Sequence, residues 1–266
     1  MRLRGDKDIR IITEAINGFS QAYHDNFFTV RRIGQKYIAE KHPTEATARE
    51  LAYSIRPILE KWGAGRRKAP HLRDKRDFTA AFLSADLHDK LAWLTQFPIN
   101  SLGFDGGRRL VNNDYNRETL EKFDTTLLDV IQELSNSLFK KNTNVTYPLK
   151  ALLLISGLMP ALDSKVRSGL GNAGFRGVDK RQFLIPKNIG STDAKKLTRL
   201  PFILGQCWRE CCEQIRGGIQ QSEFKQLSQD AGRVFDVLLF MQAGKSLQTP
   251  TLLKLELERE PWYELK

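Results

Sequence analysis

One short segment holds the side chains with the most obvious chemical potential. It covers residues 150–171 and reads K-ALLLISGLM-PALD-SKVRSGLG. Asp163 stands directly before a predicted helix at 164–170, where an Asp commonly accepts hydrogen bonds from the free N–H groups of the first turn. A carboxylate fixed there could also stabilise a positive charge developing on a sugar, or orient an attacking water. One oxygen can cap while the other faces a substrate, so the two roles are compatible.

Lys150 is the second candidate catalytic residue, thirteen positions before Asp163. A Lys near the start of so apolar a helix often extends its ammonium to water, and this is the role we expect. The alternative is a desolvated amine with a lowered pKa, able to attack the sugar of an abasic site.

The chain carries a strong positive charge. It has 42 Lys and Arg against 31 Asp and Glu, a formal net charge of +11, and such an excess attracts polyanions. We expect a nucleic-acid partner whose phosphates contact basic side chains. The candidates are Arg66, Arg67, Lys68, Arg108, Arg109, Lys165, Arg167 and Arg176. The alternative for each is an ordinary solvated charge.

Aromatic side chains could stack on a displaced base or fill the gap that it leaves. The candidates for a base pocket are Trp62, Tyr147, Phe104 and Phe175, with ordinary packing as the alternative.

The three cysteines, Cys207, Cys211 and Cys212, are clustered in one segment, which is not a disulfide framework. Their spacing allows at most a partial metal site, so we expect them to pack in the core. The sequence has no P-loop, no dinucleotide-binding fingerprint, no Gly-x-Ser-x-Gly and no zinc-deaminase pattern. We therefore expect neither a metal nor a cofactor.

Hydrophobic periodicity predicts an all-α protein with no strand. Helices are expected at 8–23, around 30–38, and at 45–62, 78–97, 119–140, 147–158, 164–170, 201–215 and 223–241, with a last pattern after Pro250. Thr44 is a plausible N-cap for the third helix, and 100–116 reads as a long loop. We expect a single two-lobed domain over 1–266, with a lobe boundary in the loop 63–77 and a catalytic segment at 147–171.

Targeting signals are not visible. The N-terminus, MRLRGDKDIR, has no apolar region of the secretory type. The most apolar stretch, 149–162, is too short to span a bilayer and contains a Lys, a Gly and a Pro. We expect a cytoplasmic monomer that does not bind membranes.

The string PALDSKVRSGLG resembles the catalytic-Asp segment of the helix-hairpin-helix DNA glycosylase superfamily. It resembles more closely a divergent bacterial branch in which a Lys opens an apolar helix, P-x-x-D follows, and an upstream helix ends in W-G followed by Arg. Here Trp62 and Gly63, with Arg66 and Arg67 shortly after, are similar. The resemblance implies a two-lobed helical fold, a DNA partner and base excision with Asp163 as the key carboxylate.

Three departures from that superfamily stand out. The hairpin signature L-P-G-V-G is absent, and KKNTNVTY at 140–147 occupies roughly its place. Lys150 is closer to Asp163 than the catalytic Lys of the bifunctional members is to its Asp, so we expect a monofunctional enzyme. The four-Cys iron–sulfur loop of some members is also missing.

The hypothesis is therefore a DNA glycosylase that flips and excises a damaged or modified base and leaves an abasic site. The range of the superfamily suggests one unusual substrate, the modified cytosine of phage DNA, which would make the protein a defence enzyme. Two alternatives remain. One is a nucleic-acid-binding protein without catalysis, and the other is a helical interaction module of a defence or toxin–antitoxin system.

Overall fold

The computed structural model describes residues 7–105, 107–175, 177–178, 182–243 and 252–254. Within them the chain forms eleven α-helices, two short 3-10 helices and one two-stranded sheet. The all-α prediction is confirmed. The pattern expected after Pro250 lies almost entirely outside the described residues.

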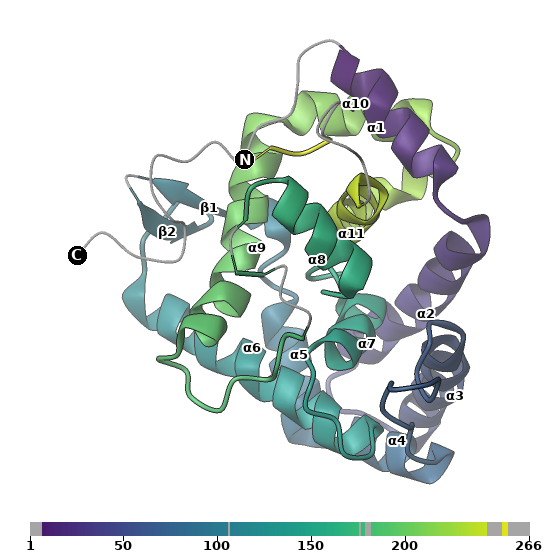
Figure 1. Cartoon of the computed structure of the whole chain (residues 1–266). Helices are drawn as coiled ribbons and strands as arrows, with labels where there is room; N and C mark the ends of the chain where they lie inside the picture. The colour runs from purple at the N-terminus through teal and green to yellow at the C-terminus, as the bar shows by residue number, and fades with distance from the viewer. Residues whose placement is uncertain (1–6, 106, 176, 179–181, 244–251, 255–266) are drawn as a thin grey trace.

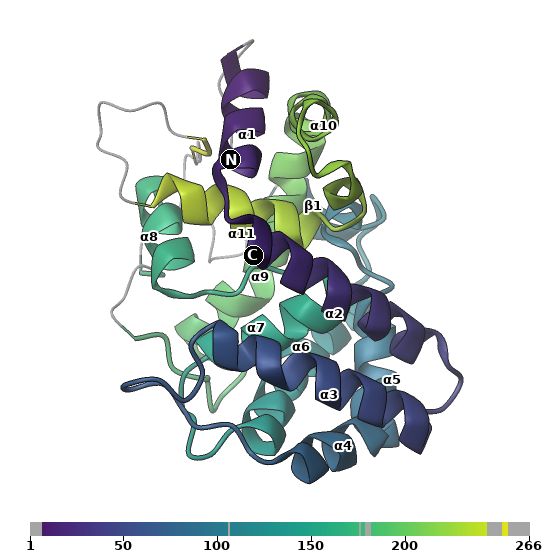
Figure 2. The same cartoon turned by 90° about the vertical axis from the view of Figure 1, so that its right-hand side faces the viewer.

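Six helices from the first part of the chain pack together. They are α2 (Gln21–Ala39), α3 (Glu45–Lys61), α4 (Lys75–Leu83), α5 (Ala85–Leu94), α6 (Arg117–Leu138) and α7 (Thr146–Ser156). In this first group α3 contacts both α2 and α4, α6 contacts α4 and α5, and α7 contacts α2, α3 and α6. Figure 2 shows α3 between α2 and α4.

The second group joins the start of the chain to its last helices. Its members are α1 (Lys7–Gly18), α8 (Ser164–Asn172), α9 (Thr192–Glu210), α10 (Cys212–Gln221) and α11 (Ala231–Gln242). Helix α1 packs on α10 and α11, and α8 packs on α11. In Figure 1 the purple α1 lies beside the light green α10.

The chain passes between the two groups at residues 19–20 and again at 157–163, the turn that leads to Asp163. The predicted lobe boundary at 63–77 is not where the groups divide. That loop joins α3 to α4, and these two helices pack directly on each other inside the first group. The candidate catalytic carboxylate therefore lies at a crossing point of the chain.

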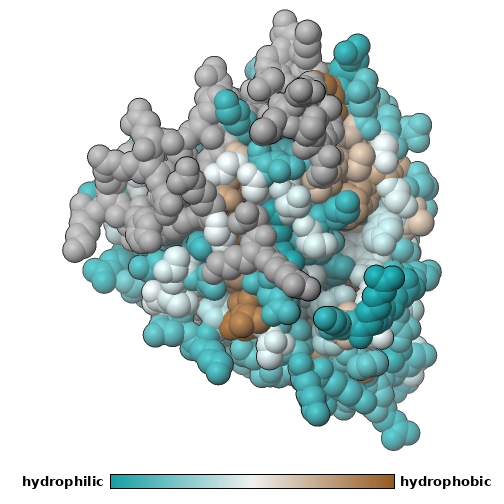
Figure 3. All heavy atoms as spheres, viewed as in Figure 1, coloured by the Kyte–Doolittle hydropathy of each residue, from teal (hydrophilic) through white to brown (hydrophobic). Residues whose placement is uncertain are grey.

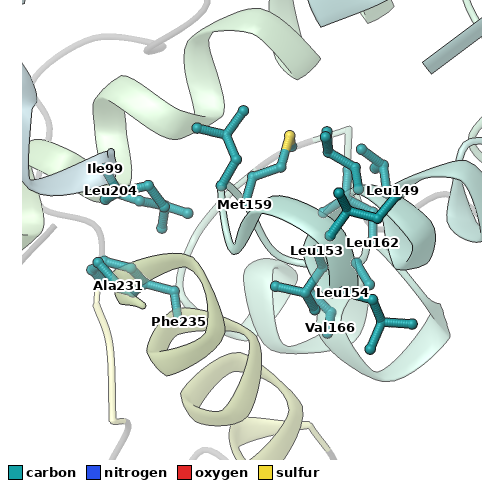
Figure 4. Close-up of a cluster of buried hydrophobic side chains, with 14 of the residues drawn as sticks. Ile99, Leu149, Leu153, Leu154, Met159, Leu162, Val166, Leu204, Ala231 and Phe235 are labelled. Atoms are coloured by element: carbon teal, nitrogen blue, oxygen red, sulfur yellow. The ribbon is translucent and has the colours of Figure 1, made fainter. Parts of the chain in front are cut away.

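Helix α7 is buried on all sides, as its apolar sequence predicts. Every residue from Pro148 to Ser156 is buried. Figure 4 shows Leu153 and Leu154 of α7 close to Leu162 and Val166, which flank Asp163. These apolar contacts fix the backbone on both sides of the carboxylate.

Two predicted helices are each divided by a break in the helical backbone. The predicted helix 8–23 ends at Gly18, and α2 begins at Gln21, earlier than its pattern indicates. The predicted helix 78–97 is interrupted at Ser84, whose hydroxyl accepts a hydrogen bond from the Leu87 N–H at 3.3 Å. Ser competes for backbone groups in this way and commonly starts a new helix. The Thr44 cap of α3 is confirmed.

The C-terminal helices also differ from their prediction. Pro201 does not start a helix but lies inside α9, which begins at Thr192 with Ser191 as its N-cap. The predicted helix 201–215 is divided at Cys211 between α9 and α10. The predicted helix 223–241 becomes a 3-10 turn, Lys225–Gln229, followed by α11. Packing of apolar faces, which local patterns do not report, decides such boundaries.

The expected loop at 100–116 contains a β-hairpin. Strand β1 (Leu102–Asp105) pairs antiparallel with β2 (Arg108–Val111). Four residues per strand are too few for a convincing alternation, which is why the sequence did not predict them. After β2, Asn112 and Asn113 adopt positive φ values of 52° and 67°, a conformation that Asn tolerates in tight turns.

In the described part of the chain no helix is both long enough and apolar enough to cross a membrane. The face of the molecule seen in Figure 3 is largely hydrophilic, with small separate apolar patches.

Candidate functional site

An open pocket of about 380 Å³ brings Lys150 and Asp163 together. Its walls come from four parts of the chain: the end of the loop before α4, the loop between α6 and α7, the facing ends of α7 and α8, and residues 182–184. The sequence-predicted residues in its lining are Lys68, Tyr147, Lys150, Asp163 and Arg167. Its volume falls in the range of about 300–1,000 Å³ that is usual for small-ligand sites.

The two carboxylate oxygens of Asp163 have different surroundings. Its Oδ1 accepts from the N–H groups of Lys165 at 2.9 Å and Val166 at 3.0 Å, so it is the N-cap of α8. Its Oδ2 is directed elsewhere and lies 4.0 Å from Nζ of Lys150. The side chain is 25% exposed. One oxygen is therefore committed to the helix, and the other remains available to the pocket.

Lys150 does not extend its ammonium to surface water, so the expected snorkelling is wrong. Its Nζ donates a 2.7 Å hydrogen bond to the carbonyl oxygen of Trp62, and the side chain is only 10% exposed. Burial lowers the pKa of Lys150, while the negative charges of Asp163 and Asp236 oppose that shift. A buried cation needs polar partners, and these groups supply them.

Tyr147 forms a second link between α7 and the end of α3. Its hydroxyl donates to the carbonyl oxygen of Gly63 at 3.0 Å, and its ring centre lies 5.1 Å from Nζ of Lys150. Burial, and then the charge of Asp163, raise the pKa of Tyr147. Gly63 has φ of 101°, a conformation that favours glycine. Tyr147 and Lys150 thus anchor the base of the loop that carries Arg66, Arg67 and Lys68.

Three of the four predicted base-pocket aromatics do not line this pocket. Trp62 is buried, and its carbonyl oxygen rather than its ring serves the site. Phe175 is 1% exposed and belongs to the core. Phe104 lies on β1 and packs against Phe202, with ring centres 6.3 Å apart. Of the four, Tyr147 is the aromatic in the pocket wall.

The predicted phosphate-binding residues divide into those near the pocket and those away from it. Lys68 and Arg167 line it. Arg66, Arg67 and Lys165 are exposed on the two segments that border it. Burial lowers the pKa of Arg167, and the charge of Asp163 opposes the shift.

Away from the pocket, Arg108 is exposed near the ring of Tyr115. Arg109 is 6% exposed and forms two hydrogen bonds with Asp124, at 2.5 and 2.9 Å. Its guanidinium is used inside the fold, so its assignment to phosphate binding is corrected. Arg176 lies outside the described residues.

The loop between α6 and α7 forms a wall of the pocket that was not predicted from the sequence. The backbone N–H of Val145 donates to the carbonyl oxygen of Phe183 at 3.0 Å. The N–H of Ile185 donates to the carbonyl oxygen of Thr143 at 2.9 Å. The segments 143–145 and 183–185 therefore pair through their backbones. Lys141, with φ of 52°, adds a cation to the pocket lining. The segment that pairs with KKNTNVTY lies about forty residues further along the chain, so no local pattern predicts the pairing.

The cysteine prediction is confirmed in its main point. Cys207 and Cys211 are buried, and Cys212 is half-buried. A hydrogen bond from Cys207 to Cys211, together with burial, raises the pKa of the Cys207 thiol. Among the described residues no group of three or more His, Cys, Asp or Glu side chains is placed to hold a metal ion.

Comparison with known proteins gives no evidence on function, so a functional proposal must rest on the geometry of the pocket. No family model, curated protein or solved structure matches the chain.

Proposed function

We propose that the protein is a DNA N-glycosylase in which Asp163 is the key carboxylate. The observation that carries the proposal is that its two carboxylate oxygens have different positions and partners. Oδ1 caps α8, and Oδ2 faces a pocket that also contains the ammonium of Lys150, 4.0 Å away. A carboxylate held in a fixed direction stabilises a developing cation without having to reorganise.

In the proposed reaction a nucleotide leaves the base stack and enters the pocket. As the N-glycosidic bond breaks, its electron pair leaves with the base and positive charge develops on the sugar. Oδ2 of Asp163 stabilises that charge, and a water adds its hydroxyl to C1′. The water's remaining proton neutralises the departing base, and the products are the free base and an abasic site.

Basic side chains around the pocket support a DNA substrate. Lys68, Lys141 and Arg167 line it, and Arg66 and Lys165 are exposed nearby. Phosphates contacted by these cations would orient the strand over the pocket mouth. The net charge of +11 favours the same kind of partner.

The direct test incubates the pure protein with duplex genomic DNAs that contain normal or modified bases, including modified phage cytosines. Abasic sites are detected with an aldehyde-reactive probe, and freed bases by mass spectrometry. We expect both products from at least one DNA, in equal amounts. Neither product from any DNA would reject the proposal.

A non-catalytic nucleic-acid-binding protein is the second candidate. The favouring observation is that Lys150 already binds the Trp62 carbonyl and that Asp163 is a complete N-cap, so both residues have structural roles. Salt-dependent DNA binding without abasic sites would select this candidate.

A further inference from the structure

A buried ion pair on α11 lies behind the pocket. Nη1 of Arg233 donates to Oδ2 of Asp236 at 2.6 Å, and the two side chains are 1% and 8% exposed. Neither residue lines the pocket. Burial lowers the pKa of Arg233 and raises that of Asp236, so water would stabilise each charge better than this environment does.

The free oxygen of Asp236 is used by the turn that leads to Asp163. Oδ1 accepts the N–H of Ala161 at 2.9 Å, two residues before Asp163. Helix α11 comes very close to this turn: a Cβ at Gly232 would lie 2.2 Å from the carbonyl oxygen of Gly157. Asp236 therefore holds the turn without itself lining the pocket.

The partner of Asp236 reaches the other half of the site. The guanidinium of Arg233 lies 5.5 Å from the ring centre of Trp62, whose carbonyl oxygen holds Lys150. It also faces the rings of Phe19 and Phe27, at 4.9 and 5.1 Å. One ion pair thus contacts two residues next to the site. Asp236 bonds Ala161 in the turn before Asp163, and Arg233 faces Trp62, whose carbonyl oxygen binds Lys150.

We propose that Asp236 is a positioning residue that sets the direction of the Asp163 carboxylate through the N–H of Ala161. This inference rests on the proposed function, because direction matters only if Asp163 acts on a substrate. It predicts that the rate of base excision depends on the hydrogen bond from the Ala161 N–H to Asp236, and not on the charges of Arg233 and Asp236. Misplacement by about 1 Å of a group in such a site commonly costs about a hundredfold in rate.

Two double variants isolate that hydrogen bond. Arg233→Met with Asp236→Asn removes both charges but keeps an oxygen that can accept from Ala161. Arg233→Met with Asp236→Leu removes both charges and the acceptor. Replacing a buried ion pair by apolar residues is often tolerated, so both variants should fold. The matched control is Arg31→Met with Asp230→Leu. Arg31 and Asp230 form a 2.7 Å pair at the start of α11, in which Arg31 also donates to the carbonyl oxygen of Ile155. This pair lies beside Gly157, whereas the Ala161 N–H is bonded by Asp236.

Four readouts are compared: the thermal midpoint, the single-turnover rate of abasic-site formation, and two local signals that need no substrate. The latter are hydrogen exchange of the Ala161 amide and the ¹³Cε resonance of Lys150 in lysine-labelled protein, which responds to the position of the Asp163 charge.

We expect the Asn variant and the Arg31–Asp230 control to keep rates within about threefold of wild type. The Leu variant should lose about a hundredfold in rate, exchange Ala161 faster and shift the Lys150 resonance.

Equal rates and equal resonances in the Asn and Leu variants would overturn the inference while leaving the glycosylase proposal intact. If wild type makes no abasic sites, the proposed function fails, and the two substrate-free signals still decide the positioning of Asp163. If the Leu variant unfolds, Arg233→Met with Asp236→Ala, which also lacks the acceptor for the Ala161 N–H, replaces it in the same comparisons.

Discussion

Nζ of Lys150 lies 4.0 Å from Oδ2 of Asp163, thirteen positions further along the chain, where the N-terminal ends of α7 and α8 meet. The separation is too long for a hydrogen bond. It is close enough for each charge to affect the other in a site that is largely screened from water. Oδ2 thus remains able to accept a hydrogen bond from a water in the pocket, or to attract a sugar carbon that bears partial positive charge.

Binding to duplex DNA should depend steeply on salt. The double variant Arg66→Glu with Lys68→Glu should reduce the slope of log K against log salt by about two, since each lost phosphate contact removes about one. Fluorescence anisotropy between low and moderate salt measures the slope. A matched reversal at Arg216 and Lys225, exposed residues away from the pocket, should change it less. Equal effects of the two reversals would remove the loop 66–68 from the proposed interface.

Borohydride should trap no covalent adduct between the protein and abasic DNA. The amine of Lys150 is held by the carbonyl oxygen of Trp62 at 2.7 Å, and a nucleophile must leave that contact before it can attack. Gel electrophoresis after reduction is the measurement, with a known bifunctional glycosylase as the positive control. An adduct that Lys150→Ala abolishes would replace the monofunctional assignment by a lyase mechanism, which the lowered pKa of Lys150 would then help to explain.

Arg109→Met should destabilise the fold without changing affinity for DNA. Arg109 and Asp124 form a largely buried bidentate pair, and removing one partner of such a pair commonly costs about 3–5 kcal/mol. Arg108→Met, at the exposed neighbour, should cost much less. Chemical denaturation measures stability, and the anisotropy assay measures binding. Weaker DNA binding by a stable Arg109→Met would instead return Arg109 to the interface.

His24 should make the protein less stable in mild acid. Burial, and then the charge of Arg233, lower the pKa of His24 from 6.5 to about 4. The unfolded chain therefore binds more protons than the folded one between these two values, so stability falls as pH falls through that window. The ring makes its hydrogen bond, 3.3 Å, with the carbonyl oxygen of Ile16.

Thermal midpoints between pH 7.5 and 4.5 check this sign. His24→Gln can keep a donor for Ile16 but does not titrate, so its midpoint should fall less than that of wild type as pH is lowered. His42→Gln, at an exposed histidine, should follow wild type. Parallel curves for all three proteins would show that His24 does not control the acid response.

The features that could be predicted from sequence are mostly local. An Asp before S-K-V predicts an N-cap because the carboxylate and the N–H groups that donate to it lie within three residues, and α8 has that cap. Thr44 is similar. The uniform apolarity of α7 indicates its central place because a helix apolar on every face must be surrounded by protein.

The features that could not be predicted depend on distant partners. The carbonyl oxygen that holds Lys150 belongs to Trp62, 88 residues earlier. Arg109 looked like a surface charge because its partner, Asp124, lies on the next helix. Asp236 stands 75 residues from Ala161 and has no local motif. Composition and periodicity report neighbours along the chain, whereas these contacts follow from the tertiary packing of segments that are distant in sequence.

Asp163→Asn separates the structural role of Asp163 from the chemical one. Asn is as good an N-cap as Asp, so α8 and most of the stability should be retained. The substitution removes the negative charge that would face a sugar cation, and loss of such stabilisation commonly lowers a rate by about a hundredfold or more.

The decisive measurement is therefore the single-turnover rate of abasic-site formation by Asp163→Asn, on the DNA that wild type cleaves best, alongside its thermal midpoint and DNA affinity. The account predicts a variant that melts within roughly a few degrees of wild type, binds DNA equally well and forms abasic sites at least about a hundredfold more slowly. A folded variant that keeps the full wild-type rate would show that Asp163 is only a helix cap, and would contradict the proposal that its carboxylate drives base excision.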